Sequence, residues 1–216
     1  MKTLLTFGDS WPRGAELQRN QQPYGHWLCQ LLNYDNWQNF ADGGTSLEHL
    51  ILQLQEYLNV HDANDQVTAI FFLTNPVRTA YFKNNLHFRQ TTSPGEQEQW
   101  LYFQDYVWLR ASIAIAAAQQ ACRLHNIDDY YFSGWIKYDN LLPIVQQEKI
   151  WKMAKETVID WFGADAVTGE FIDRIRHNQY VKPNLMHPNE LGHKLIAERL
   201  ASWIAQVQTG EHTDVV

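Results

Sequence analysis

The sequence has little of what marks fibrous, disordered or disulfide-stapled proteins. Among its 216 residues, 2 are cysteine, 7 are proline and 11 are glycine, which excludes collagen-like chains, low-complexity disorder and a disulfide framework. Cys29 and Cys122 lie far apart in helical patterns and are expected to be free, buried thiols. The nucleotide-binding glycine motifs, Cys-x-x-Cys and His-Glu-x-x-His are also absent. Nucleotide binding and zinc chemistry are therefore not expected.

Basic residues and long apolar runs are scarce as well. With 17 Lys and Arg against 24 Asp and Glu, the formal net charge is −7. No run of basic residues occurs, so nucleic acid is not expected as a partner. No stretch approaches the roughly 20 apolar residues of a membrane span, and the apolar run within residues 1–8 is too short for a secretion signal. The chain is therefore expected to be soluble and cytoplasmic.

What the sequence does contain is an alternation of strand and helix patterns. Thr45 and Glu48 form a capping-box pattern before one of the helices. Helices of this length between strands predict right-handed crossovers and a parallel sheet covered on both faces. The expected strands cover residues 3–7, 36–41, 67–73 and 129–133, and the expected helices cover 24–32, 47–58, 100–121, 151–162 and 188–207.

The length favours one domain, which we expect over residues 1–208. Residues 74–97 show no clear period and hold two prolines and a glycine, so they are interpreted as an irregular insertion. Residues 209–216 are expected to form a disordered tail.

Polar residues that follow the predicted strands are the candidates for chemistry, because reacting groups of parallel sheets gather at the carboxyl ends of the strands. Ser10 follows the first strand within Gly8-Asp9-Ser10-Trp11, and Gly44 and Asn75 follow the next two. His187, before the last helix, is a candidate base for a nucleophilic Ser10. The backbone N–H groups of Ser10 and Gly44 and the Asn75 side-chain amide are candidate oxyanion donors. Each residue also has an ordinary interpretation as part of a turn, a helix cap or the core.

In order and placement these residues resemble the SGNH hydrolases, also called the GDSL esterase/lipase family. The resemblance covers nearly the whole chain and implies a flavodoxin-like, three-layer αβα sandwich around a mainly parallel five-stranded sheet. It also implies an esterase or carbohydrate acetylesterase that cleaves a small ester through an acyl-serine intermediate, with no metal or organic cofactor. The similar segments are Gly8-Asp9-Ser10, the stretch from Asn39 to Ser46 with Gly44, Asn75, and His187-Pro188-Asn189-x-x-Gly192-His193.

Carried over residue by residue, the resemblance makes Ser10 the nucleophile and an oxyanion donor. Gly44 and Asn75 become the other donors, and His187 becomes the general base. Asp9 belongs to the motif and is expected to be structural. The third block departs from the family's usual Gly-x-Asn-Asp, because Pro76 follows Asn75.

A more serious departure concerns the residue that orients the base. The family's last block is usually Asp-x-x-His, whereas Asn184 stands three residues before His187. Asn184, a backbone carbonyl, Asp165 and Asp173 are the alternatives for orienting the ring. Asn would hold the ring without stabilising its positive charge, so a slow enzyme is expected. A catalytically silent binding module and an acyltransferase using the same serine remain alternatives.

The substrate is less defined than the reaction. Tyr81 and Phe82 of the insertion are expected to contact substrate if the insertion forms a lid or pocket wall, and a packed connector is the alternative. Trp11 is expected either to line the pocket or to anchor the first loop, and His193 is expected to be structural. The acyl group, the alcohol and the oligomeric state stay open.

Overall fold

A four-stranded parallel sheet forms the centre of the molecule. The computed structural model describes the chain over residues 1–60, 65–76, 78–83, 86–90, 104–134, 136–151, 157–161, 179–181 and 187–210. The sheet has the strand order β2-β1-β3-β6, and every adjacent pair runs parallel. This confirms the α/β class and the parallel sheet predicted from the alternating patterns. Its strands are β1 (Lys2–Phe7), β2 (Asn36–Asn39), β3 (Gln66–Leu73) and β6 (Ile127–Ser133).

The central strands are buried on both faces, as the continuous apolar pattern of residues 67–73 indicates. Phe7, Phe71 and Tyr131 occupy paired positions on β1, β3 and β6. Their rings stack with centroids 4.8 Å apart at each step. This aromatic ladder fixes the register of the strands just before their carboxyl ends, where a one-residue slip would turn each ring to the opposite face.

The family resemblance implied five strands, whereas the described residues contain four in this sheet. A single parallel bridge joins Ile150 to Tyr131 on the outer edge of β6, and the Trp151 N–H donates to the Tyr131 carbonyl at 2.9 Å. The chain at Ile150 thus lies beside β6 as a fifth strand would, but within the described residues only Ile150 pairs with it. The five-stranded detail is not confirmed.

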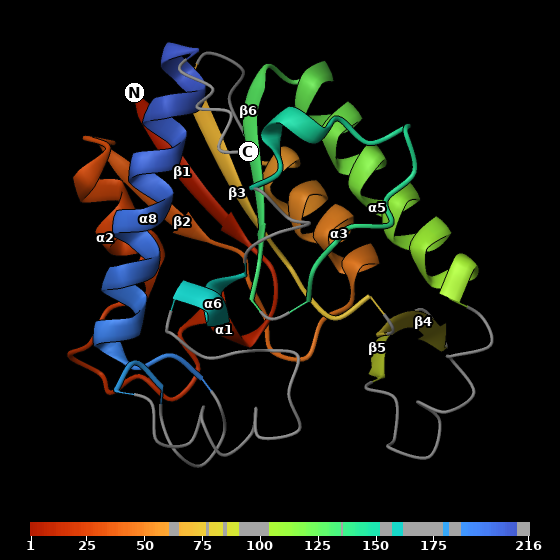
Figure 1. The fold of residues 1–216 in the computed structure, drawn as a ribbon, viewed down its shortest axis with the longest axis horizontal. Helices are drawn as coiled ribbons and strands as arrows, with labels where there is room; N and C mark the ends of the chain where they lie inside the picture. Colours follow the sequence, from red (N-terminus) through yellow and green to blue (C-terminus); the bar gives the residue numbers. More distant parts are fainter. Residues whose placement is uncertain are drawn as a thin grey trace.

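Helices cover both faces of the sheet (Figure 1). On one face lie α2 (Tyr24–Leu31) and α8 (Glu190–Thr209), which pack on each other, and on the other lie α3 (Leu47–Leu58) and α5 (Gln104–Leu124). The small residues Ala111, Ala114 and Ala118 of α5 are buried, which lets this helix approach its neighbours closely. Shorter elements are α1 (Ser10–Arg13), the 3₁₀ turn η2 (Gln147–Lys149) and α6 (Val158–Trp161).

The interpretation of residues 74–97 as irregular is wrong for part of that segment. β4 (Thr79–Lys83) and β5 (Leu86–Gln90) pair antiparallel as a separate two-stranded sheet. The sequence carries a hairpin signal, because two short runs with aromatic residues flank Asn84-Asn85, a residue type common in tight turns. The prolines outside the hairpin obscured this signal.

Two helix starts also differ from expectation. The N-cap of α3 is Ser46 rather than Thr45, and the Thr45 hydroxyl instead donates to the Gly8 carbonyl at 3.0 Å. A tertiary hydrogen bond has therefore replaced the predicted capping box. At α8, Asn189 is the N-cap and accepts from the Gly192 N–H at 3.0 Å, so the helix begins two residues after Pro188.

Other expectations fall partly outside the described residues. The helix expected over 151–162 is present as α6, but it is wrong at Trp151, which is bonded to β6, and at Thr157, which is not helical. Residues 152–156 and 162 lie outside the described part. The same holds for residues 91–97 of the insertion, for 100–103 before α5 and for 211–216 of the expected tail.

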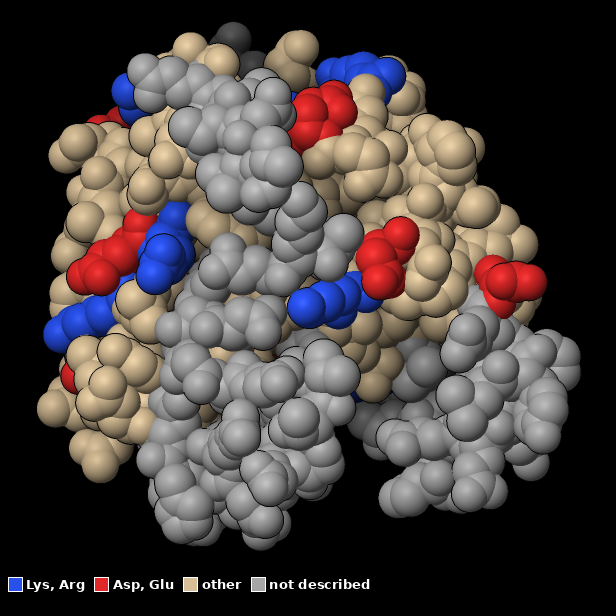
Figure 2. Space-filling view, in the orientation of Figure 1, with Lys and Arg blue, Asp and Glu red and all other residues tan. Residues whose placement is uncertain are grey.

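Charges of both signs are mixed on the surface. In Figure 2, Lys and Arg side chains lie beside Asp and Glu across the described part of the visible face. Lys149, for example, contacts Asp128 at 2.6 Å and Asp129 at 3.3 Å. No helix within the described ranges combines the length and apolarity needed to cross a membrane. Cys29 and Cys122 are both free thiols, and burial raises the pKa of the Cys122 thiol well above its usual value.

Candidate active site

The turn between β1 and α1 places Ser10 at the carboxyl edge of the sheet. Gly8 has φ +135°, and an added Cβ would lie 2.8 Å from Phe72 Cβ, so only glycine fits this close approach. Asp9 then caps α1, because its Oδ1 accepts from the Trp11 N–H at 3.1 Å. Ser10 is the first residue of α1 and is partly exposed. The local sequence thus presents one hydroxyl on a tightly held turn.

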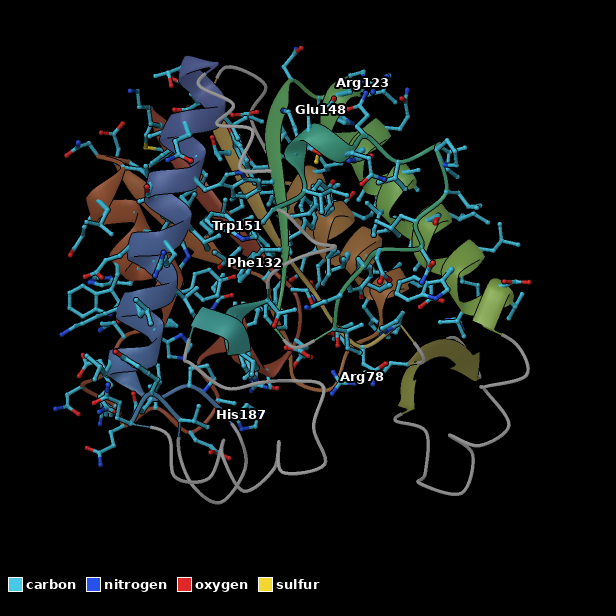
Figure 3. All side chains as sticks on the ribbon, in the orientation of Figure 1. Arg78, Arg123, Phe132, Glu148, Trp151 and His187 are labelled. Carbon is cyan, nitrogen blue, oxygen red and sulfur yellow. The ribbon has the colours of Figure 1, made fainter. Side chains whose placement is uncertain are left out.

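His187 lies against this hydroxyl from the opposite end of the chain. Its Nε2 is 2.8 Å from Ser10 Oγ, a distance suited to proton transfer. Three contacts hold the segment that carries it. Val181 bridges Pro188, the Asn189 side-chain amide donates to the Gln179 carbonyl at 2.6 Å, and the Asn189 backbone N–H donates to the Tyr180 carbonyl at 2.8 Å. Figure 3 shows His187 at the same edge of the fold as Arg78. Ser10 and His187, which the sequence motifs paired as nucleophile and base, are thus in direct contact.

The candidate oxyanion donors Gly44 and Asn75 belong to loops bonded to the residues before Ser10. Thr45, next to Gly44, donates to the Gly8 carbonyl, and Thr74, next to Asn75, donates to Asp9 Oδ2 at 2.8 Å. Gly44 has φ +71° with open space where a Cβ would stand. All three predicted donors thus lie on loops that meet around the nucleophile turn.

Asp9 forms the scaffold of these loops. Its side chain is fully buried and also accepts from Arg78 Nη1 at 2.7 Å. The Arg78 N–H donates to the Asn75 carbonyl at 3.1 Å, so the same residue holds the Asn75 turn. Tyr138 donates its hydroxyl to the Thr74 carbonyl. Burial, and secondarily the charge of Asp9, raise the pKa of Tyr138 well above its ordinary value, so it stays a protonated donor.

A different carboxylate from the three predicted side chains lies beside His187. Asn184, Asp165 and Asp173 all lie outside the described residues. The structure instead brings Glu16 to the ring, with Oε1 3.2 Å from His187 Nδ1. Sequence analysis missed Glu16, because a carboxylate six residues after Ser10 follows no motif or periodicity. Its proximity to the nucleophile helix was the one available signal.

The remaining residues singled out from the sequence are two buried ones and two without described side chains. Trp11 is 1% exposed and stacks on Phe72 with ring centroids 5.5 Å apart, which favours the loop-anchor alternative. Tyr81 and Phe82 lie on β4, but their side chains are outside the described part of the chain. His193 is buried, and its Nδ1 accepts from the Tyr24 N–H at 3.2 Å, which ties α8 to the first turn of α2.

Within the ranges that the structure describes, no three His, Cys, Asp or Glu side chains gather as a metal site would require. The polar groups at this edge are a hydroxyl, an imidazole, carboxylates and hydrogen-bond donors. Such a set suits nucleophilic and acid–base chemistry.

The overall architecture is similar to that of lipolytic proteins. A protein assigned to the lipolytic G-D-S-L family from Desulfitobacterium hafniense DCB-2 has a TM-score of 0.55 at 12% identity, covering 93% of this chain and 98% of that one. The lipase Lip_vut3 from a goat rumen metagenome has a TM-score of 0.53 at 12% identity, covering 94% and 97%. No family model matches the sequence, and no curated protein does. The chain therefore has the SGNH/GDSL hydrolase fold, as the sequence motifs indicated.

Proposed function

We propose that this protein, which has the fold of the GDSL lipolytic proteins, is a serine hydrolase that cleaves small esters. The observation that carries the proposal is the 2.8 Å contact between Ser10 Oγ and His187 Nε2. A serine hydroxyl is a weak nucleophile until a base within hydrogen-bond reach takes its proton. That contact also argues against a silent binding module, because a site that only binds has no need of a base on this hydroxyl.

The mechanism is acyl transfer in two steps. His187 Nε2 takes the proton of Ser10 as Oγ attacks the ester carbonyl, and the protonated ring then gives that proton to the departing alcohol. Water attacks the acyl-serine with His187 again as base, which releases the acid and restores the hydroxyl. In both steps the Ser10 and Gly44 N–H groups and the Asn75 amide donate to the oxyanion.

Replacing the nucleophile tests the proposal. Ser10→Ala should lower kcat/KM for a short-chain aryl ester by at least about 10³-fold, since the remaining donors cannot form an acyl intermediate. The matched control is Ser202→Ala, an exposed serine on α8, which should leave the rate unchanged. Hydrolysis by Ser10→Ala at the wild-type rate would contradict the proposal.

A covalent probe separates a catalytic serine from an inert one. A fluorophosphonate should label the wild-type protein at Ser10, and mass spectrometry of the digested adduct identifies the residue. Absence of labelling would support the silent module instead. An acyltransferase would give acylated acceptor as the main product when a sugar or alcohol is added, whereas the proposed hydrolase gives free acid.

A further inference from the structure

The ring nitrogen of His187 that faces away from Ser10 requires a partner. For Nε2 to accept the serine proton, the neutral ring must carry its own proton on Nδ1. Nδ1 is shielded from solvent and makes no well-aligned hydrogen bond to a described residue. Glu16 Oε1 lies 3.2 Å away, so a small rotation of either side chain completes an N–H···O bond.

The backbone of Glu16 has an unusual conformation. Its φ is +69°, a left-handed value that residues with a Cβ rarely adopt. The Leu17 N–H donates to the Gly14 carbonyl at 3.1 Å, so Glu16 is the third residue of a tight turn, where glycine or asparagine is favoured. Strain of this kind at a reactive centre points to a role for the side chain that it aims.

This turn is bonded directly to the nucleophile. The Ala15 N–H donates to the Ser10 carbonyl at 2.9 Å, and the Gly14 N–H donates to the Trp11 carbonyl at 2.9 Å. Glu16 is therefore fixed relative to Ser10 by two hydrogen bonds of the helix end. One short segment thus carries both the hydroxyl and the carboxylate, on either side of the same imidazole.

Arg13, a cation three residues before Glu16, has a different partner. Arg13 pairs with Asp42, its Nη1 lying 2.8 Å from Oδ1. Glu16 and His187 are both partly buried, with side chains 22% and 19% exposed. Their interaction is therefore less screened than that of a fully exposed pair.

We propose that Glu16 is the positioning residue that orients His187 and balances the charge of its imidazolium. This inference rests on the proposed function. When the Ser10 proton moves to Nε2, the ring becomes positive, its Nδ1–H stays in place, and the Glu16 carboxylate faces it without taking the proton. SGNH hydrolases usually place this carboxylate three residues before the histidine. Here Glu16 supplies it from the segment that follows Ser10.

Removing the charge at constant size is the first test. Glu16→Gln should lower kcat/KM for a short-chain aryl ester about 10²-fold, less than the roughly 10⁴-fold loss of the fully buried serine-protease carboxylate. The loss should fall on kcat, with KM within about twofold of the wild type, because the carboxylate acts on the charged ring and not on bound substrate. The control Glu190→Gln removes an equal charge from the first turn of α8 and should change the rate by less than twofold.

Relieving the backbone strain is the second test. Glu16→Gly suits the left-handed conformation, so its Tm should not fall below that of the wild type, while its rate falls at least as far as that of Glu16→Gln. A purely structural role for Glu16 predicts that the Tm and the rate fall together. That coupled result would overturn the inference.

A third set of variants distinguishes Glu16 from the other candidates. Asn184→Ala, Asp165→Asn and Asp173→Asn should each lose less activity than Glu16→Gln. If one of them lowers kcat about 10²-fold at unchanged KM and Glu16→Gln does not, the inference is wrong. Fluorophosphonate labelling of Ser10 keeps the two proposals apart: labelled wild-type protein with an unaffected Glu16→Gln overturns only the role of Glu16, whereas absent labelling overturns the proposed function.

Discussion

Two carboxylates follow β1 in the same short segment, and the structure treats them in opposite ways. Asp9 is fully buried and accepts from the Trp11 N–H, the Thr74 hydroxyl and Arg78. Glu16 is partly exposed, and its Oε1 lies 3.2 Å from His187 Nδ1. One carboxylate has its lone pairs occupied by fixed donors, while the other faces a group whose charge changes during the proposed reaction.

The difference distinguishes a carboxylate that holds the loops together from one that is proposed to assist the reaction. A buried carboxylate needs its donors whatever the state of the substrate, because an uncompensated charge in the interior is costly. A partly exposed carboxylate costs little folding free energy when its partner is neutral. It interacts more favourably with that partner once the partner becomes charged. Burial and partner number therefore predict which substitutions affect stability and which affect rate.

The largest effect on stability is expected at Arg78. Arg78→Met should lower the free energy of unfolding by about 3 kcal/mol, because it leaves Asp9 buried without its cation. Urea unfolding followed by Trp fluorescence measures the change. Arg123→Met on the exposed end of α5 is the matched control, expected within about 0.5 kcal/mol. If Arg78→Met lowered the free energy of unfolding by as little as the control, the structural role assigned to Asp9 would be wrong.

An intermediate effect is expected at Glu48, whose side chain is 35% exposed and contacts Arg110. Burial tends to raise the pKa of Glu48, but hydrogen bonds from Ser46 and Arg110 outweigh it, and the pKa lies below its usual value. The stabilisation is then present above the unfolded-state pKa and is lost as pH falls through the folded-state value.

Glu48→Gln should accordingly cost about 0.5–1 kcal/mol at pH 7 and nothing once the carboxylate is protonated in both states. Urea midpoints of the wild type and the variant, compared at neutral pH and at the lowest pH where both fold, give the test. A difference between the two that grows on acidification would reverse the assigned sign.

The smallest effect on stability is expected at Glu16. Glu16→Gln should change the free energy of unfolding by no more than about 0.5 kcal/mol, in contrast with its large effect on rate. The same urea experiment measures it. A loss as large as that of Arg78→Met would place both carboxylates in the scaffold and end the distinction between them.

The parts of the fold that follow from local patterns were predictable. Buried apolar runs identified β1 and β3, and amphipathic spacing identified α2 and α3. The hairpin β4–β5 was missed because its residues were interpreted together with the prolines around it. The capping box at Thr45 was wrong because the hydroxyl had a partner in another loop, on Gly8, which local sequence does not show.

The site was predictable to a similar extent. Ser10, Gly44, Asn75 and His187 could be named because each follows a strand or precedes a helix within a motif, and the structure brings Ser10 and His187 together. Glu16 could not be named, because its contact depends on a left-handed backbone angle and on where a distant histidine comes to lie.

By itself the sequence determined the fold class, the main alternation of strands and helices and the candidate pair Ser10 and His187, since hydrophobic periodicity and motifs are local properties. Tertiary structure alone decided the partners: which of two carboxylates is enclosed by donors and which faces His187. Partner choice depends on side chains from remote segments meeting at one edge of the sheet, where distances of about 3 Å decide whether a proton can move.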